Sequence, residues 1–182
     1  LSGGPNAVAM ADTPRAPQEV FDLALPVLGI CYGQQIMCQQ LGGRVDPGTS
    51  REFGRATLEI GESCALFEGL WPAGETRTVW MSHGDHVSKL PKNFKLLASS
   101  ENLEYSIAGD TKKKYYGIQF HPEVSHTQDG NEILKNFSLK ICKIKTSWTI
   151  SNYKNLILDD IRQKVGNAKV ILGLSGGVDS AV

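Results

Sequence analysis

The chain alternates between two hydrophobic patterns. Amphipathic segments with apolar residues three or four positions apart predict helices, and short apolar or alternating runs predict strands. The expected helices cover residues 16–25, 34–41 and 155–165 and the stretch after Gly130. The expected strands cover residues 27–30, 53–60, 77–82, 96–99, 115–120 and 170–174. Because the two kinds of element alternate, we expect an α/β fold with an open, mainly parallel sheet and helices on both faces.

A polar stretch divides the chain. Residues 143–149 carry few apolar side chains and show little periodicity, which is typical of a linker. We therefore expect one domain over residues 1–146 and the beginning of a second over residues 147–182. The Gly-rich turn at Leu1-Ser2-Gly3-Gly4-Pro5 predicts a preceding strand outside the sequence, and the chain stops at Val182 soon after another turn. We expect both domains to be truncated.

A cysteine on a glycine-flanked turn is the strongest candidate for chemistry in the first domain. Cys31 lies in Gly29-Ile30-Cys31-Tyr32-Gly33, between a predicted strand and a predicted helix. The glycines permit a tight turn that lifts the side chain above the sheet. The N-terminus of the following helix favours the thiolate, which is the reactive form of cysteine. The pattern predicts a nucleophile, against the alternative of a buried cysteine that merely precedes a helix.

The segment around His121 supplies a base for that nucleophile. Pro122 favours extended backbone at His121, and residues two apart in an extended chain project from the same side. His121 and Glu123 therefore face one site, with His121 as the base and acid and Glu123 as the group that orients the imidazole. A lone histidine is more often structural, but the preceding strand, the proline and the paired carboxylate favour catalysis here.

An acyl-transfer site also needs donors for the oxyanion that develops on the substrate. The turn at Cys31 places the backbone N–H of Tyr32 for this role, and a second N–H is expected from Gly3-Gly4.

A second small-residue turn follows the last predicted strand. Glycines there let the backbone approach a ligand, and a helix N-terminus presents free N–H groups, so the arrangement predicts a phosphate site. The turn residues are Ser175, Gly176, Gly177, Val178, Asp179 and Ser180. The second domain is therefore expected to bind a nucleotide.

Composition restricts the classes of partner. The 182 residues are 41% hydrophobic and 21% charged, and the formal net charge is zero. These values are typical of a globular protein that acts on small molecules, and they give no electrostatic reason to expect nucleic acid or a membrane as partner. No apolar run approaches the about 20 residues that a membrane span needs.

The cysteines other than Cys31 and the histidines other than His121 give no sign of a second catalytic or metal site. The four cysteines form no C-x-x-C pair and have no histidine at metal-ligand spacing, so we expect free thiols, no metal site and a reducing, cytoplasmic setting. We expect packing roles for Cys38, Cys64 and Cys142. We expect His86 and His126 at the surface or in loops.

Three segments resemble the signatures of class I glutamine amidotransferases. They are Leu1-Ser2-Gly3-Gly4-Pro5, Gly29-Ile30-Cys31-Tyr32-Gly33-Gln34-Gln35 and Gln119-Phe120-His121-Pro122-Glu123. Two further segments resemble the GMP synthases of that family, and the match spans nearly the whole chain. They are Met81-Ser82-His83-Gly84-Asp85 and Leu174-Ser175-Gly176-Gly177-Val178-Asp179-Ser180. The resemblance implies a flavodoxin-like amidotransferase domain followed by the first helix, strand and phosphate turn of an ATP pyrophosphatase domain.

The resemblance also implies roles for individual residues. Cys31 would attack the side-chain amide of glutamine and form a thioester, with His121 and Glu123 completing a catalytic triad. The oxyanion would be held by the N–H groups of Gly4 and Tyr32. Glutamine would be bound by Gln35, Ser82, Gly84 and Asp85.

For the second domain, the resemblance implies use of ATP and Mg²⁺, with the turn from Ser175 to Ser180 on the phosphates. Xanthosine monophosphate (XMP) would be adenylated, and ammonia from glutamine would displace AMP to give GMP. The resemblance further implies a homodimer formed through a C-terminal segment beyond Val182.

Three alternatives remain open at this point. The first is the glutaminase unit of carbamoyl-phosphate, anthranilate or CTP synthesis, against which the terminal Ser-Gly-Gly-Val-Asp-Ser argues. The second is a stand-alone γ-glutamyl hydrolase with the same triad. The third is a non-catalytic binding module, which the intact Cys31, His121 and Glu123 disfavour.

Overall fold

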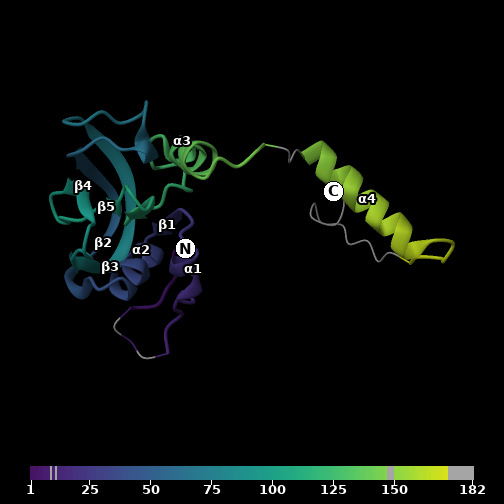
Figure 1. Ribbon diagram of the computed structural model, residues 1–182, viewed down its shortest axis with the longest axis horizontal. Helices are drawn as coiled ribbons and strands as arrows, with labels where there is room; N and C mark the ends of the chain where they lie inside the picture. Colours follow the sequence, from purple (N-terminus) through teal and green to yellow (C-terminus); the bar gives the residue numbers. More distant parts are fainter. Residues whose placement is uncertain (9, 11, 147–149, 172–182) are drawn as a thin grey trace. The chain divides into compact units, whose positions relative to one another are not determined.

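One six-stranded sheet organises the larger part of the protein. The computed structural model describes residues 1–8, 10, 12–146 and 150–171, and the chain divides into two units, Leu1–Ile144 and Lys145–Val182. The strands are β1 (Val27–Ile30), β2 (Arg44–Ile60), β3 (Thr76–Lys89), β4 (Lys95–Ser100), β5 (Ile107–Asp110) and β6 (Tyr115–Ile118). The helical elements are α1 (Glu19–Asp22), α2 (Tyr32–Gln40), η1 (Ala65–Phe67), α3 (Gly130–Lys135), η2 (Asn136–Ile141) and α4 (Ile150–Val165). The sheet order is β1-β6-β5-β4-β2-β3. Figure 1 labels β1 to β5 in this sheet.

The sheet is mixed, so the expectation of a mainly parallel sheet is wrong. Within the described residues, β1 and β6 pair in parallel, with Val27 opposite Tyr115 and Ile30 opposite Ile118. The other four pairings are antiparallel. Short connections explain the difference, because the few residues between β4, β5 and β6 cannot form the crossover that parallel neighbours need.

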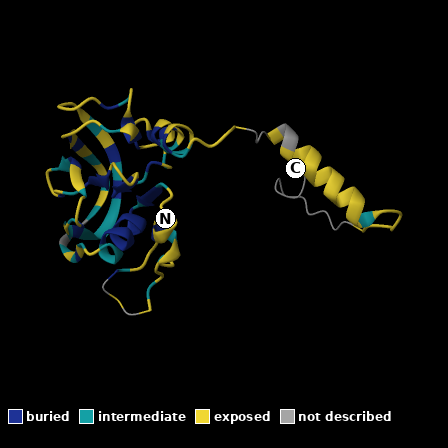
Figure 2. Cartoon of the chain, in the orientation of Figure 1, coloured by how far each residue is buried: buried dark blue, intermediate teal, exposed yellow. Residues whose placement is uncertain are grey.

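Both faces of the sheet are covered by helical elements, as expected. Neighbouring residues of a strand point to opposite faces, and Tyr115 and Tyr116 of β6 show this directly. Tyr115 packs in a cluster with Phe21 of α1 and Met37 of α2, whereas Tyr116 belongs to the larger core with Ile133 of α3. Figure 2 shows α2 as a mostly buried helix, in contrast to the exposed α1.

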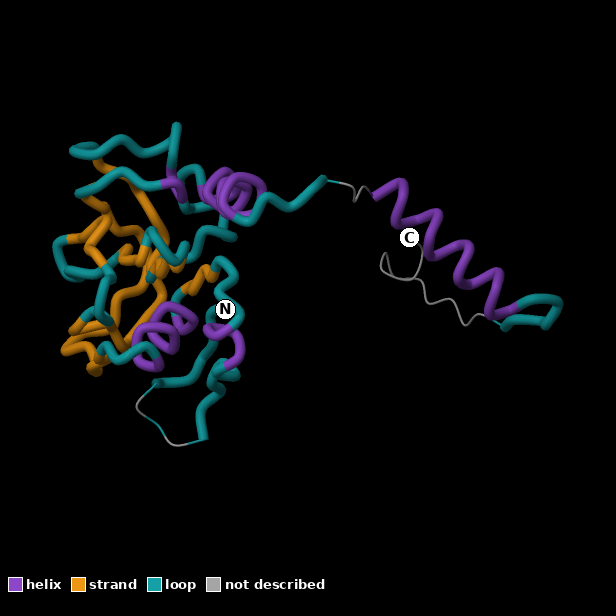
Figure 3. Tube along the Cα trace, in the orientation of Figure 1, coloured by secondary structure: helices purple, strands orange, loops and turns teal. Residues whose placement is uncertain are grey.

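The helices differ from the prediction at their ends. α1 has four residues instead of the expected ten. At its C-terminal end, Ala24 adopts a left-handed φ of 53° and interrupts the helix before Pro26. α2 begins at Tyr32 and ends in the predicted left-handed cap, where Gly42 has φ 93°. The N–H of Gly43 donates to the carbonyl of Cys38 at 2.8 Å, which completes a Schellman motif. The helix expected after Gly130 is α3, which continues as the π-helical η2 (Figure 3).

Two strands are longer than predicted and one was not predicted. The runs at 53–60 and 77–82 lie inside β2 and β3, which pair antiparallel with a register shift between Pro47 and Glu52. Proline and glycine at 47–48 break the hydrophobic alternation there, so the sequence pattern misses the first half of β2. β5 contains Ala108 and Gly109, whose small side chains give no strand signal.

The second unit contains the helix predicted over residues 155–165, which begins earlier, at Ile150. Val170 and Ile171, the first two residues of the strand predicted over 170–174, are in neither helix nor strand. The rest of that strand lies outside the described residues. So do all six residues of the predicted phosphate turn: Ser175, Gly176, Gly177, Val178, Asp179 and Ser180.

Within residues 1–8, 10, 12–146 and 150–171, no helix combines the length and the apolar character needed to cross a bilayer.

Gly130 has a packing role that can be tested. A Cβ added at Gly130 would lie 2.0 Å from the carbonyl oxygen of Pro122, so the start of α3 contacts the backbone between His121 and Glu123. Gly130→Ala should lower the free energy of unfolding by about 1–3 kcal/mol, the usual cost of overpacking. Gly61→Ala is the control, because its Cβ would make only a 3.5 Å contact with the carbonyl oxygen of Leu97. Chemical denaturation measures both variants, and equal losses would contradict the packing role.

Candidate active site

Cys31 lies on a sharp bend between β1 and α2. Its backbone has φ 52° and ψ −110°, a strained conformation for a residue other than glycine that costs about 1–3 kcal/mol. Its N–H donates to the carbonyl of Ile118 in β6 at 2.8 Å. The side chain is 5% exposed. The bend predicted from the sequence is therefore present, and the sheet fixes its position.

The two glycines that flank Cys31 are required by close backbone contacts. A Cβ at Gly29 would lie 2.6 Å from the carbonyl oxygen of Gly33, and a Cβ at Gly33 would lie 2.2 Å from the carbonyl oxygen of Leu1. Leu1 runs beside β1, since its amino group donates to Leu28 and its carbonyl accepts from Ile30. This contact holds the N-terminal Gly-rich segment next to Cys31.

His121 and Glu123 meet at the end of β6. Nδ1 of His121 is 2.6 Å from Oε1 of Glu123. The backbone of His121 is held on both sides, because its N–H donates to Trp80 at 3.0 Å and its carbonyl accepts from the hydroxyl of Thr127. Glu123 is exposed, whereas the side chain of His121 is mostly covered.

The structure brings His121 against Cys31. A Cβ added at Gly3 would lie 3.1 Å from Cε1 of His121 and 3.6 Å from Cβ of Cys31, so both side chains border the same point. The hydrogen bond between His121 and the sulfur is the main factor that raises the pKa of His121 to about 9. Partial burial opposes this shift and the bond to Glu123 supports it. These effects favour the protonated form of His121, which lies between the sulfur of Cys31 and the carboxylate of Glu123.

A pocket of about 500 Å³ opens beside Cys31. The residues predicted to bind glutamine or the oxyanion all line it: Gly4, Tyr32, Gln35, Ser82, Gly84 and Asp85. Tyr32 is the first residue of α2, so its N–H has no acceptor within the helix. The pocket thus unites Cys31 with the predicted binding residues, while His121 and Glu123 lie next to Cys31 and are not part of the lining. The roles given to all of these residues remain predictions.

Asp85 lines this pocket and also carries a buried carboxylate oxygen. Its Oδ2 is buried, and no hydrogen-bond partner for it is present among the described residues. Burying a polar oxygen without a hydrogen-bond partner is costly, which sets Asp85 apart among the residues that line the pocket.

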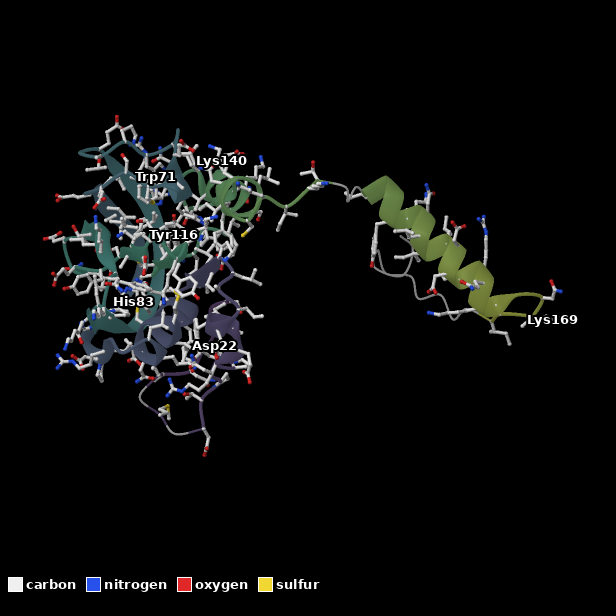
Figure 4. The ribbon with its side chains drawn as sticks, viewed as in Figure 1. Asp22, Trp71, His83, Tyr116, Lys140 and Lys169 are labelled. Atoms are coloured by element: carbon white, nitrogen blue, oxygen red, sulfur yellow. The ribbon has the colours of Figure 1, made fainter. Side chains whose placement is uncertain are left out.

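Three residues near Cys31 were given no role from the sequence: His83, Glu52 and Gln119. His83, labelled in Figure 4, lines the pocket, where Nε2 lies 3.1 Å from Oε2 of Glu52. Burial lowers the pKa of His83, against the opposing effect of Glu52. Gln119 is fully buried, and its Nε2 lies 3.6 Å from the sulfur of Cys31. Gln119 becomes a candidate for a role at the sulfur because it is buried there, and the sequence does not show that burial.

The other cysteines are poorly suited to act as nucleophiles. Burial raises the pKa of Cys38 to about 12 and that of Cys64 to about 11, and it also raises the pKa of Cys142. These thiols are therefore protonated at neutral pH. His126 is exposed and its ring lies 4.6 Å from that of Trp80, while His86 is half-buried on β3.

Comparisons with known proteins identify the family to which this chain is similar. A family model for class I glutamine amidotransferases matches residues 1–141. The chain is 54% identical over 182 residues to the glutamine-hydrolyzing GMP synthase of Bartonella henselae, and 52% identical to that of Brucella melitensis. The whole chain aligns, but it spans only 35% and 36% of the length of these two relatives.

Solved structures show the same fold. A candidate GMP synthase component of Thermoplasma acidophilum is 33% identical with a TM-score of 0.63, and the match covers 78% of this chain and 65% of that one. A glutamine amidotransferase of Thermotoga maritima is 25% identical with a TM-score of 0.53, and the match covers 81% and 59%.

The contact between Cys31 and His121 predicts that the pKa of His121 changes when the sulfur is removed. Cys31→Ala should lower the pKa of His121 from about 9 toward the ordinary 6.5, because it removes the largest factor that raises it. NMR titration of the imidazole signals measures the shift. Cys142→Ser, at a thiol outside the pocket, is the control and should leave the titration in place. A pKa that stays near 9 in Cys31→Ala would show that the sulfur does not contact the ring.

Proposed function

The chain belongs to the class I glutamine amidotransferase family, and we propose that it hydrolyses the side-chain amide of glutamine and releases ammonia. The observation that carries this proposal is Cys31, held on a strained bend, placed beside His121 and open to a pocket of about 500 Å³. A pocket of this volume suits a small substrate that is mostly enclosed.

In the first half-reaction, the thiolate of Cys31 attacks the carbon of the substrate's side-chain amide. The amide oxygen becomes an oxyanion, which the N–H groups of Tyr32 and Gly4 stabilise. The imidazolium of His121 gives its proton to the amide nitrogen as the C–N bond breaks. Ammonia leaves, and a glutamyl thioester on Cys31 remains.

In the second half-reaction, water replaces ammonia. His121, now neutral, takes a proton from the water as its oxygen attacks the thioester carbon. The second oxyanion collapses, the C–S bond breaks, and the thiolate and imidazolium are restored as glutamate leaves. Glu123 holds Nδ1 of His121 at 2.6 Å throughout, which keeps the other ring nitrogen directed at the reacting atoms.

Substrate recognition follows from the polar groups of the pocket. The carboxylate of Asp85, which lines the pocket, suits the α-ammonium of glutamine, which brings both positive charge and N–H donors. Gln35, Ser82 and Gly84 line the same pocket and supply further polar groups for the amino acid. This arrangement selects free glutamine over an amide that lacks an α-ammonium.

We further propose that this glutaminase serves a GMP synthase, since relatives 52–54% identical over the whole chain carry that name. In such an enzyme ATP adenylates XMP and releases pyrophosphate, and ammonia then displaces AMP to give GMP. ATP phosphates would be bound at Ser175, Gly176, Gly177, Val178, Asp179 and Ser180. Mg²⁺ would bind together with the ATP phosphates in the second domain. A cytoplasmic homodimer is part of this proposal.

Joining a glutaminase to the amination site has a chemical reason. In water at neutral pH most ammonia is protonated to ammonium, which has no lone pair for attack. Passing ammonia directly to the second site keeps it reactive.

Glutamine hydrolysis by the 182-residue chain tests the main proposal. Wild type should convert glutamine to glutamate and ammonia, and Cys31→Ala should reduce the rate to background because the nucleophile is lost. Cys142→Ser should keep full activity. Equal activity in wild type and Cys31→Ala would contradict the mechanism.

The GMP assignment is tested separately in the longer protein proposed here. With Cys31→Ala, added ammonium should still support conversion of XMP and ATP to GMP and AMP. Absence of product from XMP with ammonium, while ammonium is consumed with another acceptor, would overturn this assignment.

Asp85 provides a test of substrate recognition. Asp85→Asn should raise KM for glutamine by about 10–100-fold with a smaller change in kcat, because a charge-assisted hydrogen bond to the α-ammonium is lost. Asp46→Asn, at a half-buried residue of β2 that pairs with Arg44 outside the pocket, is the control. Steady-state kinetics measure both variants, and an unchanged KM in Asp85→Asn would assign the α-ammonium to another group.

A further inference from the structure

We propose that Gln119 is a catalytic residue of this site: its buried side-chain amide donates an N–H to the sulfur of Cys31 and stabilises the thiolate. This inference rests on the proposed glutamine hydrolysis and adds a group to the Cys31, His121 and Glu123 set. Gln119 lies directly after β6, is 0% exposed, and has Nε2 3.6 Å from Sγ of Cys31.

The backbone directs Gln119 toward the sulfur. Its N–H donates to the carbonyl of Ser106 at 2.9 Å, which fixes the chain just past β6. Gln119 and His121 are two positions apart and both reach Cys31, while Phe120 between them is buried in the larger core. The sulfur is therefore contacted from one segment by an amide and by an imidazole.

The orientation of the amide is set by a second glutamine. Nε2 of Gln35 donates to Oε1 of Gln119 at 3.1 Å and to the carbonyl of Asp85 at 2.8 Å. If the amide of Gln119 were reversed, its N–H₂ group would face the N–H₂ group of Gln35, and an oxygen would face the sulfur. The arrangement in which the Gln119 nitrogen faces Cys31 is the one in which each polar atom of this group has a partner.

The groups around the sulfur explain why a donor from Gln119 would stabilise the thiolate. The thiol of Cys31 can donate to the carbonyl of Ser82, 3.5 Å from the sulfur, and that oxygen disfavours a negative charge. A thiolate buried in this position has little water to stabilise it. The N–H of Gln119 offsets the carbonyl and adds to the stabilisation by the His121 imidazolium.

The pH dependence of Cys31 alkylation tests the inference without glutamine. The 182-residue chain is treated with iodoacetamide over a range of pH, and the modified Cys31 peptide is quantified by mass spectrometry. Gln119→Met keeps the size and removes the donor, so its alkylation profile should move to higher pH and the rate at pH 7 should fall about tenfold. Turnover of glutamine should fall in kcat with little change in KM.

Two more variants make the result specific. Gln34→Met is the matched control, because Gln34 is equally buried but its Nε2 donates to the carbonyl of Tyr105, so the profile should not move. Gln119→Glu nearly preserves shape and places a carboxylate beside the sulfur, so it should move the profile to still higher pH. It also keeps the inference testable if Gln119→Met does not fold.

The outcomes separate this inference from the proposed function. An alkylation profile that is unchanged in folded Gln119→Met or Gln119→Glu would overturn the role of Gln119, even if the chain hydrolyses glutamine. A shifted profile in a chain that hydrolyses no glutamine would support the hydrogen bond to the thiolate and overturn the proposed function.

Discussion

One strained bend holds the sulfur of Cys31 beside the imidazole of His121, and the rest of the site depends on it. Cys31 keeps φ 52° because its own N–H is bonded to β6 and because glycines on both sides allow contacts that no side chain could make. Without that bend, the side chain would have no fixed position above the sheet. The strain costs about 1–3 kcal/mol, which the packing of α2 and the strands offsets.

The sheet brings the two halves of the site together. β1 and β6 form the parallel pair of the described sheet, so their carboxyl ends lie at the same edge. Cys31 follows β1 directly and His121 follows β6 by a few residues, which explains how positions ninety apart in sequence meet. The antiparallel remainder of the sheet supplies the pocket wall, since β3 carries Ser82, Gly84 and Asp85.

The sequence predicts the chemistry of this site better than its architecture. Glycine spacing around Cys31 and the proline after His121 reflect local backbone geometry, which a short segment encodes by itself. Strand direction depends instead on which segments pair across the sheet, so hydrophobic periodicity does not predict the mixed sheet. The two-residue spacing of Gln119 and His121 is a local pattern that places both on one side of the chain, but the burial of Gln119 and its partner amide 84 residues away depend on the tertiary fold.

The most direct measurement of the central claim is covalent labelling with an electrophile shaped like glutamine, such as its chloroketone analogue. The bend, the imidazole and the pocket together predict that this reagent modifies Cys31, that free glutamine protects against it, and that the protonated thiols of Cys38, Cys64 and Cys142 do not react. Modification of one of these three in place of Cys31, or labelling that glutamine does not slow, would contradict the account.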